Sequence, residues 1–194
     1  VGTDALAYDF APDGTRIAFI GNLARPQNFD AALHFASDVL PLVRRARPGT
    51  RFRVVGRIAP DEAQRLAALD GVDVTGEVDS VADAVRGAGV AVAPLRIARG
   101  IQNKVLEYFA LGLPCVSTPL ALEGFGAEDG RELLVAESAQ AQAEAVLRLL
   151  DDRALAERLA KAARDYVEHH HSWAQILAPL RSAVADAVSS ASSR

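Results

Sequence analysis

The sequence predicts an α/β domain: a Rossmann-like, doubly wound parallel sheet of about six strands, followed by C-terminal helices. Short apolar runs that end at glycine or proline alternate with stretches in which apolar residues recur at helical spacing. Strands that alternate with helices form a parallel sheet, and right-handed connections place helices on both of its faces. With 194 residues, of which 50% are hydrophobic, the chain is long enough for one such domain with a full core.

The first half of the chain contains three predicted strands and two predicted helices. Residues 16–21 and 51–56 are predicted to be buried strands, because each is a short run that ends at glycine. Residues 28–45 are predicted to form a helix, since apolar side chains recur at helical spacing and arginines stand at its end. Residues 60–69 form a short helix with proline in its first turn, and residues 72–76 form the third strand.

The second half continues the alternation of helices and strands. A helix over residues 81–86 leads to the fourth strand at residues 90–94. A helix over residues 101–111 ends at a glycine, and the fifth strand follows at residues 114–118. A short sixth strand is predicted at residues 132–135.

The rest of the sequence is predicted to be helical up to a short tail. Residues 1–188 form one domain, and residues 189–194 form a flexible tail. The composition includes no methionine, so we expect Val1 to be a cut end and the chain to be a piece of a longer protein. The helices predicted after the last strand cover residues 139–150, 153–168 and 172–188.

Charge and composition exclude several classes of protein. The formal net charge is −4, so the chain lacks the basic surface that broad nucleic-acid binding requires. No apolar run reaches the roughly 18 residues of a membrane span, and we find no signal-peptide pattern at the start. Cys115 is the only cysteine, so no internal disulfide forms, and its apolar surroundings predict a buried core residue.

Cationic residues cluster where the fourth strand gives way to a helix. Arg96, Arg99 and Lys104 lie in this segment, and Gly100 lets a ligand approach the backbone closely. The first turn of a helix offers free backbone N–H groups and a partial positive charge. We therefore predict an anion site here, with phosphate as its occupant.

Glu107 follows in the same predicted helix. Lys104 and Glu107 are three residues apart, and Asn103 and Glu107 are four apart, so each pair shares a helix face. Glu107 lies roughly 10 Å beyond Gly100 along a helix, which fits the phosphate and the ribose of one nucleotide. A carboxylate accepts hydrogen bonds from vicinal hydroxyls, as in dinucleotide-binding folds. The alternative interpretation is a surface helix with a Lys104–Glu107 ion pair.

The segment around Glu107 resembles a known donor-binding motif. Residues 100–107, followed by residues 108–118, are similar to the motif of the C-terminal domain of retaining, GT-B-fold glycosyltransferases of the group 1 family. The run from Arg99 to Glu107 is most similar to the branch of sugar transferases associated with bacterial exopolysaccharide systems. The resemblance extends over about residues 16–180, and strand order, glycine positions and motif agree.

The resemblance implies roles for particular residues. Glu107 holds the ribose hydroxyls, and backbone N–H groups of residues 100–102 contact the diphosphate and the sugar. The loop of residues 21–25 lies over the phosphates, and residues 56–57 and 76–78 border the base. The donor-binding residues implied in this way are Gly21, Asn22, Arg25, Arg57, Val78, Arg99, Gly100, Ile101, Gln102, Lys104 and Glu107.

The chain departs from the family pattern at two of these positions. Arg99 stands where the family often has glutamate, so that sugar contact is changed or lost, and no catalytic residue is assigned. Asn22 stands where the family often has arginine, which leaves Arg25 as the cation of that loop. We expect Lys104 and Arg99 to supply the charge for the phosphates instead.

The histidines are not predicted to bind a metal. Residues 169–171 are three consecutive histidines, but adjacent side chains point to different sides of a helix, which favours a solvated helix end. His34 stands alone and is assigned to packing or to the surface. No metal site and no cofactor is expected, since the family generally needs no bound divalent ion and the nucleotide-sugar is a substrate.

The functional prediction is a glycosyltransferase donor domain. It binds a UDP- or GDP-sugar for hexosyl transfer in polysaccharide or glycolipid assembly. Its other partner is its own N-terminal acceptor domain, which is absent from this chain, so the isolated domain is expected to be inactive. We expect a cytoplasmic location and no partner nucleic acid, with peripheral association of the full enzyme at the inner face of the membrane as an option.

Three alternatives remain. A nicotinamide-binding domain is disfavoured, because Gly21-Asn22-Leu23 lacks the second and third glycines of that fingerprint. A hydrolase-like or epimerase-like relative of the same fold also binds nucleotide-sugars and is not separated by the pocket residues. A catalytically degenerate sensor domain is the third, and the departure at Arg99 keeps it open.

Overall fold

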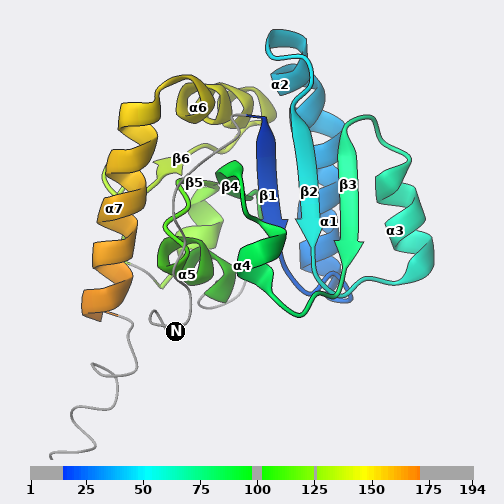
Figure 1. Ribbon diagram of the computed structural model, residues 1–194, viewed down its shortest axis with the longest axis horizontal. Helices are drawn as coiled ribbons and strands as arrows, with labels where there is room; N and C mark the ends of the chain where they lie inside the picture. The colour runs from blue at the N-terminus through cyan, green and yellow to red at the C-terminus, as the bar shows by residue number, and fades with distance from the viewer. Residues whose placement is uncertain (1–14, 98–101, 125, 171–194) are drawn as a thin grey trace, which may run out of the picture.

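The computed structural model describes residues 15–97, 102–124 and 126–170. It confirms the predicted fold class, because six parallel strands form one sheet with helices on both faces (Figure 1). The strand order is β3-β2-β1-β4-β5-β6. The strands are β1 (Arg16–Ile20), β2 (Arg51–Val55), β3 (Val72–Gly76), β4 (Ala88–Ala93), β5 (Cys115–Ser117) and β6 (Leu134–Val135).

The helices agree with the sequence predictions to within a few residues at most ends. The predicted helix at residues 172–188 and the tail at residues 189–194 lie outside the described residues. The elements present are α1 (Pro26–His34), η1 (Phe35–Val39), α2 (Leu40–Ala46), α3 (Pro60–Ala67), α4 (Val81–Ala84), α5 (Asn103–Ala110), η2 (Pro119–Leu122), α6 (Ala139–Asp151) and α7 (Arg153–His170).

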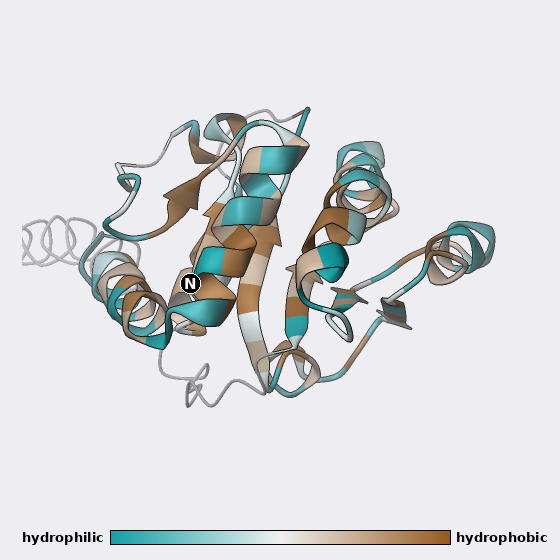
Figure 2. Ribbon diagram, turned by 90° about the horizontal axis from the view of Figure 1, so that it is seen from above, coloured by the Kyte–Doolittle hydropathy of each residue, from teal (hydrophilic) through white to brown (hydrophobic). Residues whose placement is uncertain are grey.

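The helices form two layers around the sheet. In Figure 1, α1 lies behind the sheet next to β2, whereas α4 and α5 lie in front, and α7 packs against α5. Figure 2 shows brown and pale residues along the central strands and on the helix sides that face them, which is the expected pattern for buried parallel strands. None of the helices in the described ranges is long and apolar enough to cross a membrane.

The helix predicted over residues 28–45 is interrupted by a turn of π-helix. The segment η1 separates α1 from α2, and the Leu40 amide donates a hydrogen bond to the carbonyl of Phe35, five residues back. Pro41, which follows, has no N–H group, so regular α-helical bonding to the carbonyl of Ser37 is impossible. We attribute the interruption to this proline, which the periodicity of the apolar residues did not reveal.

Aromatic side chains fill the core on the α1 side of the sheet. Phe35 of η1 and Phe52 of β2 have ring centroids 4.6 Å apart, and Phe19 of β1 lies 6.5 Å from Phe52. All three are fully buried. Cys115 is also fully buried, as expected, and burial raises the pKa of its thiol.

Arginine and aspartate side chains pair at the edge of the sheet where the strands begin. Arg51 at the start of β2 pairs with Asp73, and Arg44 of α2 pairs with Asp70 at 2.9 Å. Arg47, just after α2, pairs with Asp151 at the end of α6. This amino edge of the sheet is therefore an edge of matched charges.

The strand order fixes where a ligand can bind. From β1 the chain moves outward to β2 and β3, and then returns past β1 to β4. The carboxyl ends of β1 and β4 therefore diverge into helices on opposite faces, which leaves a crevice between them. This is the topological switch point of the domain, and it lies at the opposite edge from the matched charges.

Candidate functional site

A cavity of about 660 Å³ opens at the carboxyl ends of β1 and β2. The first residues of α1 and α5 and the residues that follow β3 also line it. Its volume suits a ligand of nucleotide size. The lining residues are Ile20, Gly21, Asn22, Arg25, Gln27, Asn28, Val55, Gly56, Arg57, Glu77, Val78, Val81, Gln102, Asn103, Lys104 and Glu107.

Two glycines bring the backbones of the β1 and β2 ends together. Gly56 has φ +131, and a Cβ built on it would lie 2.0 Å from the carbonyl oxygen of Gly21. The amide of Gly21 donates to the carbonyl of Val55 at 3.0 Å, and the amide of Gly56 donates to Gly76 at 2.9 Å. The cavity floor therefore requires glycine at position 56 for both conformation and space.

Lys104 is buried in the cavity wall. Its side chain points from α5 toward α1, and Nζ donates a hydrogen bond of 2.5 Å to Oδ1 of Asn28. Nζ also lies 5.5 Å from the ring centroid of Phe19, while the residue is only 8% exposed. Burial lowers the pKa of the Lys104 ammonium to about 8, against an opposing influence of Glu107. Lys104 therefore does not sit on a solvated helix face.

Glu107 lies one turn further along α5. It is half-buried, and burial raises the pKa of its carboxyl while Lys104 opposes that shift. Among the described residues, no side chain forms an ion pair with Glu107 or Lys104 within 4 Å. The exposed Lys104–Glu107 ion pair that the spacing allowed is therefore not formed. Instead both side chains line the cavity with hydrogen-bonding capacity left for a ligand.

Tyr108 fixes α5 against the sheet. Its hydroxyl accepts a hydrogen bond from the amide of Ile20 at 2.9 Å and donates one to the carbonyl of Val92 at 3.1 Å. These two contacts join the ends of β1 and β4, the strands that flank the switch point. Tyr108 is fully buried, and it therefore helps to anchor the helix that carries Lys104 and Glu107.

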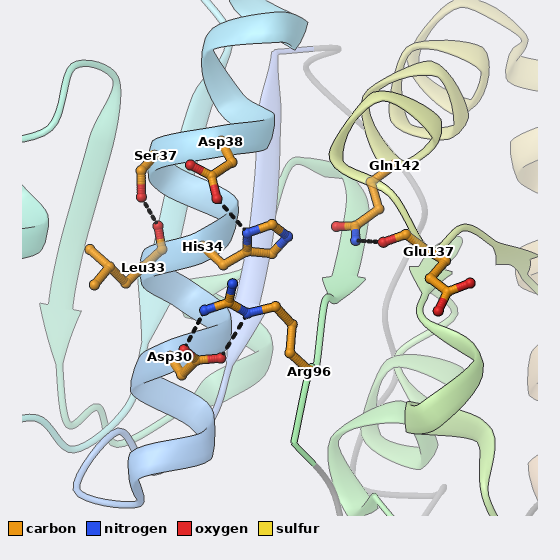
Figure 3. A network of polar contacts seen from close by, with 8 residues as sticks. All are labelled: Asp30, Leu33, His34, Ser37, Asp38, Arg96, Glu137 and Gln142. Atoms are coloured by element: carbon orange, nitrogen blue, oxygen red, sulfur yellow. Dashed lines mark hydrogen bonds and ion pairs between the residues drawn. The ribbon is translucent and has the colours of Figure 1, made fainter.

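The side chain of Arg96 lies apart from the predicted cationic cluster. Its guanidinium lies against α1, where Nη2 and Nε pair with the two carboxylate oxygens of Asp30 at 2.5 and 3.1 Å (Figure 3). Arg96 does not line the cavity, so its grouping with Lys104 in one anion site is wrong. The bidentate pair instead ties the segment after β4 to α1.

His34 lies one turn further along α1, as Figure 3 shows, and its Nδ1 is 2.7 Å from a carboxylate oxygen of Asp38. The pair joins the last residue of α1 to the adjoining η1, so His34 has a local structural partner. In the described part of the chain no group of three or more His, Cys, Asp or Glu side chains could hold a metal ion. Of the three consecutive histidines, His169 and His170 end α7, and His171 lies outside the described residues.

The structure brings most of the predicted site residues into one cavity. Arg99, Gly100 and Ile101 lie outside the described residues. Helix α5 begins at Asn103, two residues after the predicted start, so Gln102 is its N-cap. The predicted residues that line the cavity are Gly21, Asn22, Arg25, Arg57, Val78, Gln102, Lys104 and Glu107.

Sequence reasoning missed Asn28, the partner of Lys104. It lies in the first turn of α1, directly after the loop that the resemblance placed over the phosphates. Its position just after the Arg25-Pro26 helix start was the available signal, because residues in a first turn face the same crevice as the preceding loop. The pairing itself joins residues 28 and 104, and no local pattern predicts it.

The fold is a Rossmann-like α/β domain of the kind found in GT-B glycosyltransferases. The family model of glycosyl transferases group 1 matches residues 14–152, and the chain belongs to this family. No curated protein matches the sequence.

Solved structures of glycosyltransferases share the fold. Sucrose-phosphate synthase from Thermosynechococcus elongatus superposes with a TM-score of 0.75 at 20% identity, over 98% of this chain and 51% of that one. HepE of Anabaena, in complex with UDP and glucose, gives 0.71 at 12% identity, over 88% and 48%. The C-terminal domain of the group 1 protein LpcC from Francisella tularensis gives 0.69 at 16%, over 89% and 99%. The chain thus spans about half of the first two proteins and corresponds to a C-terminal domain.

Proposed function

We propose that this chain is the donor-binding half of a retaining glycosyltransferase and that its cavity holds a nucleoside diphosphate-sugar. One observation supports this most directly. A buried ammonium that has no carboxylate partner among the described residues and a half-buried carboxylate line the same cavity one helical turn apart. Burying an isolated charge is costly, so such charged side chains are expected where a bound ligand supplies their hydrogen-bond and ionic partners.

Each group has a role that matches its chemistry. The ammonium of Lys104 and the first amides of α5 suit the diphosphate, because they combine a full charge with the partial charge of a helix start. The carboxylate of Glu107 suits the ribose hydroxyls. Arg57 and Val78, on the other side of the cavity, then border the base. Arg25 lies in the loop after β1 and adds a second cation near the phosphates.

The proposed contribution to catalysis is electrostatic. During transfer the bond between the anomeric carbon of the sugar and the diphosphate oxygen breaks, and negative charge grows on the departing diphosphate. A fixed ammonium beside that oxygen stabilises the transition state more than the ground state. The acceptor and any proton acceptor for it come from a second domain, so we expect the isolated chain to bind donor without transferring sugar.

The finer assignment extends the proposal. HepE was solved with UDP, which makes UDP the first nucleotide to test here, with GDP as the second. We propose a hexosyl donor, an acceptor in polysaccharide or glycolipid assembly, and a cytoplasmic enzyme that can associate with the inner face of the membrane. No metal is required in this scheme, because Lys104 and the helix starts supply the positive charge.

A thermal-shift series with UDP, GDP, ADP and NAD tests the ligand class. A ligand that binds the folded chain raises its melting temperature in proportion to RT ln(1 + [L]/Kd). We expect UDP or GDP to stabilise the chain and NAD not to. A shift with NAD alone would identify a nicotinamide-binding domain, and no shift with any ligand would identify a degenerate domain.

Comparison of UDP with inorganic pyrophosphate tests the individual roles. Substitution Glu107→Ala is expected to weaken UDP binding roughly tenfold to a hundredfold, because two charge-assisted hydrogen bonds are lost, and to leave pyrophosphate binding unchanged. Glu144→Ala, on the exposed face of α6, removes the same charge away from the cavity and serves as the control. Equal losses for UDP and pyrophosphate would reject the ribose role of Glu107.

A further inference from the structure

We propose that Asn28 is a positioning residue that holds the ammonium of Lys104 on the cavity wall without neutralising its charge, so that the charge is left for an anionic ligand. The inference rests on the proposed function for its ligand, but the contact itself is a property of the free domain. It joins the start of α1 to the start of α5, across the switch point.

The orientation of the Asn28 amide is fixed from both sides. Its Nδ2 donates a hydrogen bond of 2.8 Å to the carbonyl oxygen of Asn22, and its Oδ1 accepts from Nζ of Lys104. An amide flipped by half a turn would place two oxygens against each other and two donors against each other. The loop after β1 therefore determines which end of Asn28 faces the lysine. That loop is in turn closed by Oδ1 of Asn22, which accepts from the amide of Ala24 at 3.1 Å.

A neutral acceptor at this place has a specific consequence. A carboxylate would form an ion pair with Lys104, and a ligand phosphate would then compete with it. The Asn28 amide satisfies one of the three ammonium protons and leaves the net charge intact. The face of Phe19 lies behind the ammonium and allows no competing anion there. Among the described residues, the other charged groups that line the same cavity are Arg25, Arg57, Glu77 and Glu107.

A double-mutant cycle separates positioning from a general structural role. UDP affinity is measured for the wild-type chain, Asn28→Ala, Lys104→Ala and the double variant. If Asn28 acts through Lys104, Asn28→Ala weakens binding about fivefold to tenfold alone and less than about twofold in the Lys104→Ala background. An equal loss in both backgrounds would show that Asn28 acts on the ligand or on the fold, and would overturn the proposal.

A charge-changing variant tests the second half of the proposal. Asn28→Asp keeps the shape of the side chain but adds a carboxylate beside Lys104, so we expect UDP affinity to fall about tenfold. Gln64→Glu makes the same amide-to-carboxylate change on the exposed side of α3, away from the cavity, and is expected to leave affinity unchanged. An Asn28→Asp variant that binds UDP as tightly as wild type contradicts the inference.

Lysine NMR provides a readout that needs no ligand. The chain contains only two lysines, Lys104 and Lys161, so ¹³C-labelled lysine gives two side-chain titrations, which Lys161→Arg assigns. We expect Asn28→Asp to raise the pKa of Lys104 and to leave Lys161 unchanged. An unchanged Lys104 titration would overturn the proposal. If the wild-type chain binds no nucleoside diphosphate, the proposed function fails, and this titration still decides whether Asn28 controls the ammonium.

Discussion

The two edges of the sheet treat positive charge in opposite ways. At the amino edge, Arg44, Arg47 and Arg51 each have an aspartate partner. At the carboxyl edge Arg96 pairs with Asp30, but Arg25, Arg57 and Lys104 line one cavity, and none of these three forms an ion pair with another described residue. Both edges belong to the same parallel sheet, so the difference does not come from the kind of backbone.

The difference separates stability from binding. Paired and solvated charges cost the fold little and contribute little, whereas an unpaired buried cation destabilises the empty domain. Below a pH of about 8 the buried Lys104 carries this cost, because its folded pKa lies below its ordinary value of 10.5. The charges at the amino edge are therefore balanced within the folded chain, whereas those that line the cavity at the carboxyl edge are balanced only when an anion is bound.

The largest expected effect compares the two ends of β2. Gly56 follows the strand, and Gly56→Ala forces a Cβ against the Gly21 carbonyl at φ +131. We expect the free energy of unfolding to fall by about 4 kcal/mol or more, measured by urea denaturation. Gly49 precedes the strand at φ +90 with open space around it, so Gly49→Ala should cost only about 1–2 kcal/mol. Similar losses for the two variants would show that the close approach of β1 and β2 is not rigid.

The next prediction removes the unpaired charge. Lys104→Met should weaken UDP binding about a hundredfold, because the ligand loses its main buried cation. The same change should raise the free energy of unfolding at about pH 7 by roughly 1–2 kcal/mol, since a buried charge is replaced by an apolar side chain of similar length. Isothermal titration and urea denaturation measure the two quantities. Lys161→Met on the exposed face of α7 is the control. A loss of stability in Lys104→Met would contradict the inference that the buried ammonium destabilises the domain when no ligand is bound.

The third prediction concerns pH. Anion binding favours protonated Lys104, so UDP affinity should be high near about pH 7 and fall roughly tenfold by about pH 9, as the ammonium loses its proton. The ligand phosphates are already ionised over this range, and arginine keeps its charge. Stability of the empty domain should move the other way, rising as pH passes from about 8 toward 10.5, where only the unfolded chain still binds the proton. In Lys104→Met both trends should vanish, and their persistence would assign them to another group.

The smallest expected effect is at the amino edge. Asp73→Asn removes the partner of Arg51, whose hydrogen bond is the main cause of the lowered pKa of Asp73. Because the two side chains are 32% and 50% exposed, we expect a loss of only about 0.5 kcal/mol and no change in UDP binding. The lowered pKa means that this contribution is present at neutral pH and disappears as the carboxylate protonates in acid. A binding defect in Asp73→Asn would break the proposed separation of the two edges.

The strands were the most predictable part of the fold. All six strands, β1 to β6, were predicted from short apolar runs, several of them ended by glycine or proline, and the alternation of strands and helices predicted a parallel sheet. The helix from residue 28 to 45 was predicted as continuous, and the π-turn at Phe35–Val39 was missed. Periodicity reports which side chains face the core, but it does not report how the backbone accommodates Pro41.

The sequence predicted which residues belong to the candidate site better than it predicted how their side chains are arranged. Spacing and resemblance selected Lys104 and Glu107, and both line the cavity. The same reasoning grouped Arg96 with them, although its guanidinium pairs with Asp30. Sequence proximity places residues on one segment, but the rotation of each side chain depends on which charges the neighbouring helix presents.

The sequence by itself determined that a cation and a carboxylate stand one turn apart where a helix follows the fourth strand, because these are matters of local spacing. Only the tertiary structure decided that Lys104 is buried, that Asn28 rather than a carboxylate holds it, and that Gly56 has no room for a side chain. Each of these depends on contacts between segments far apart in the chain. Desolvation and steric exclusion exist only once those segments are packed together, and so does the unpaired charge on which the proposed binding depends.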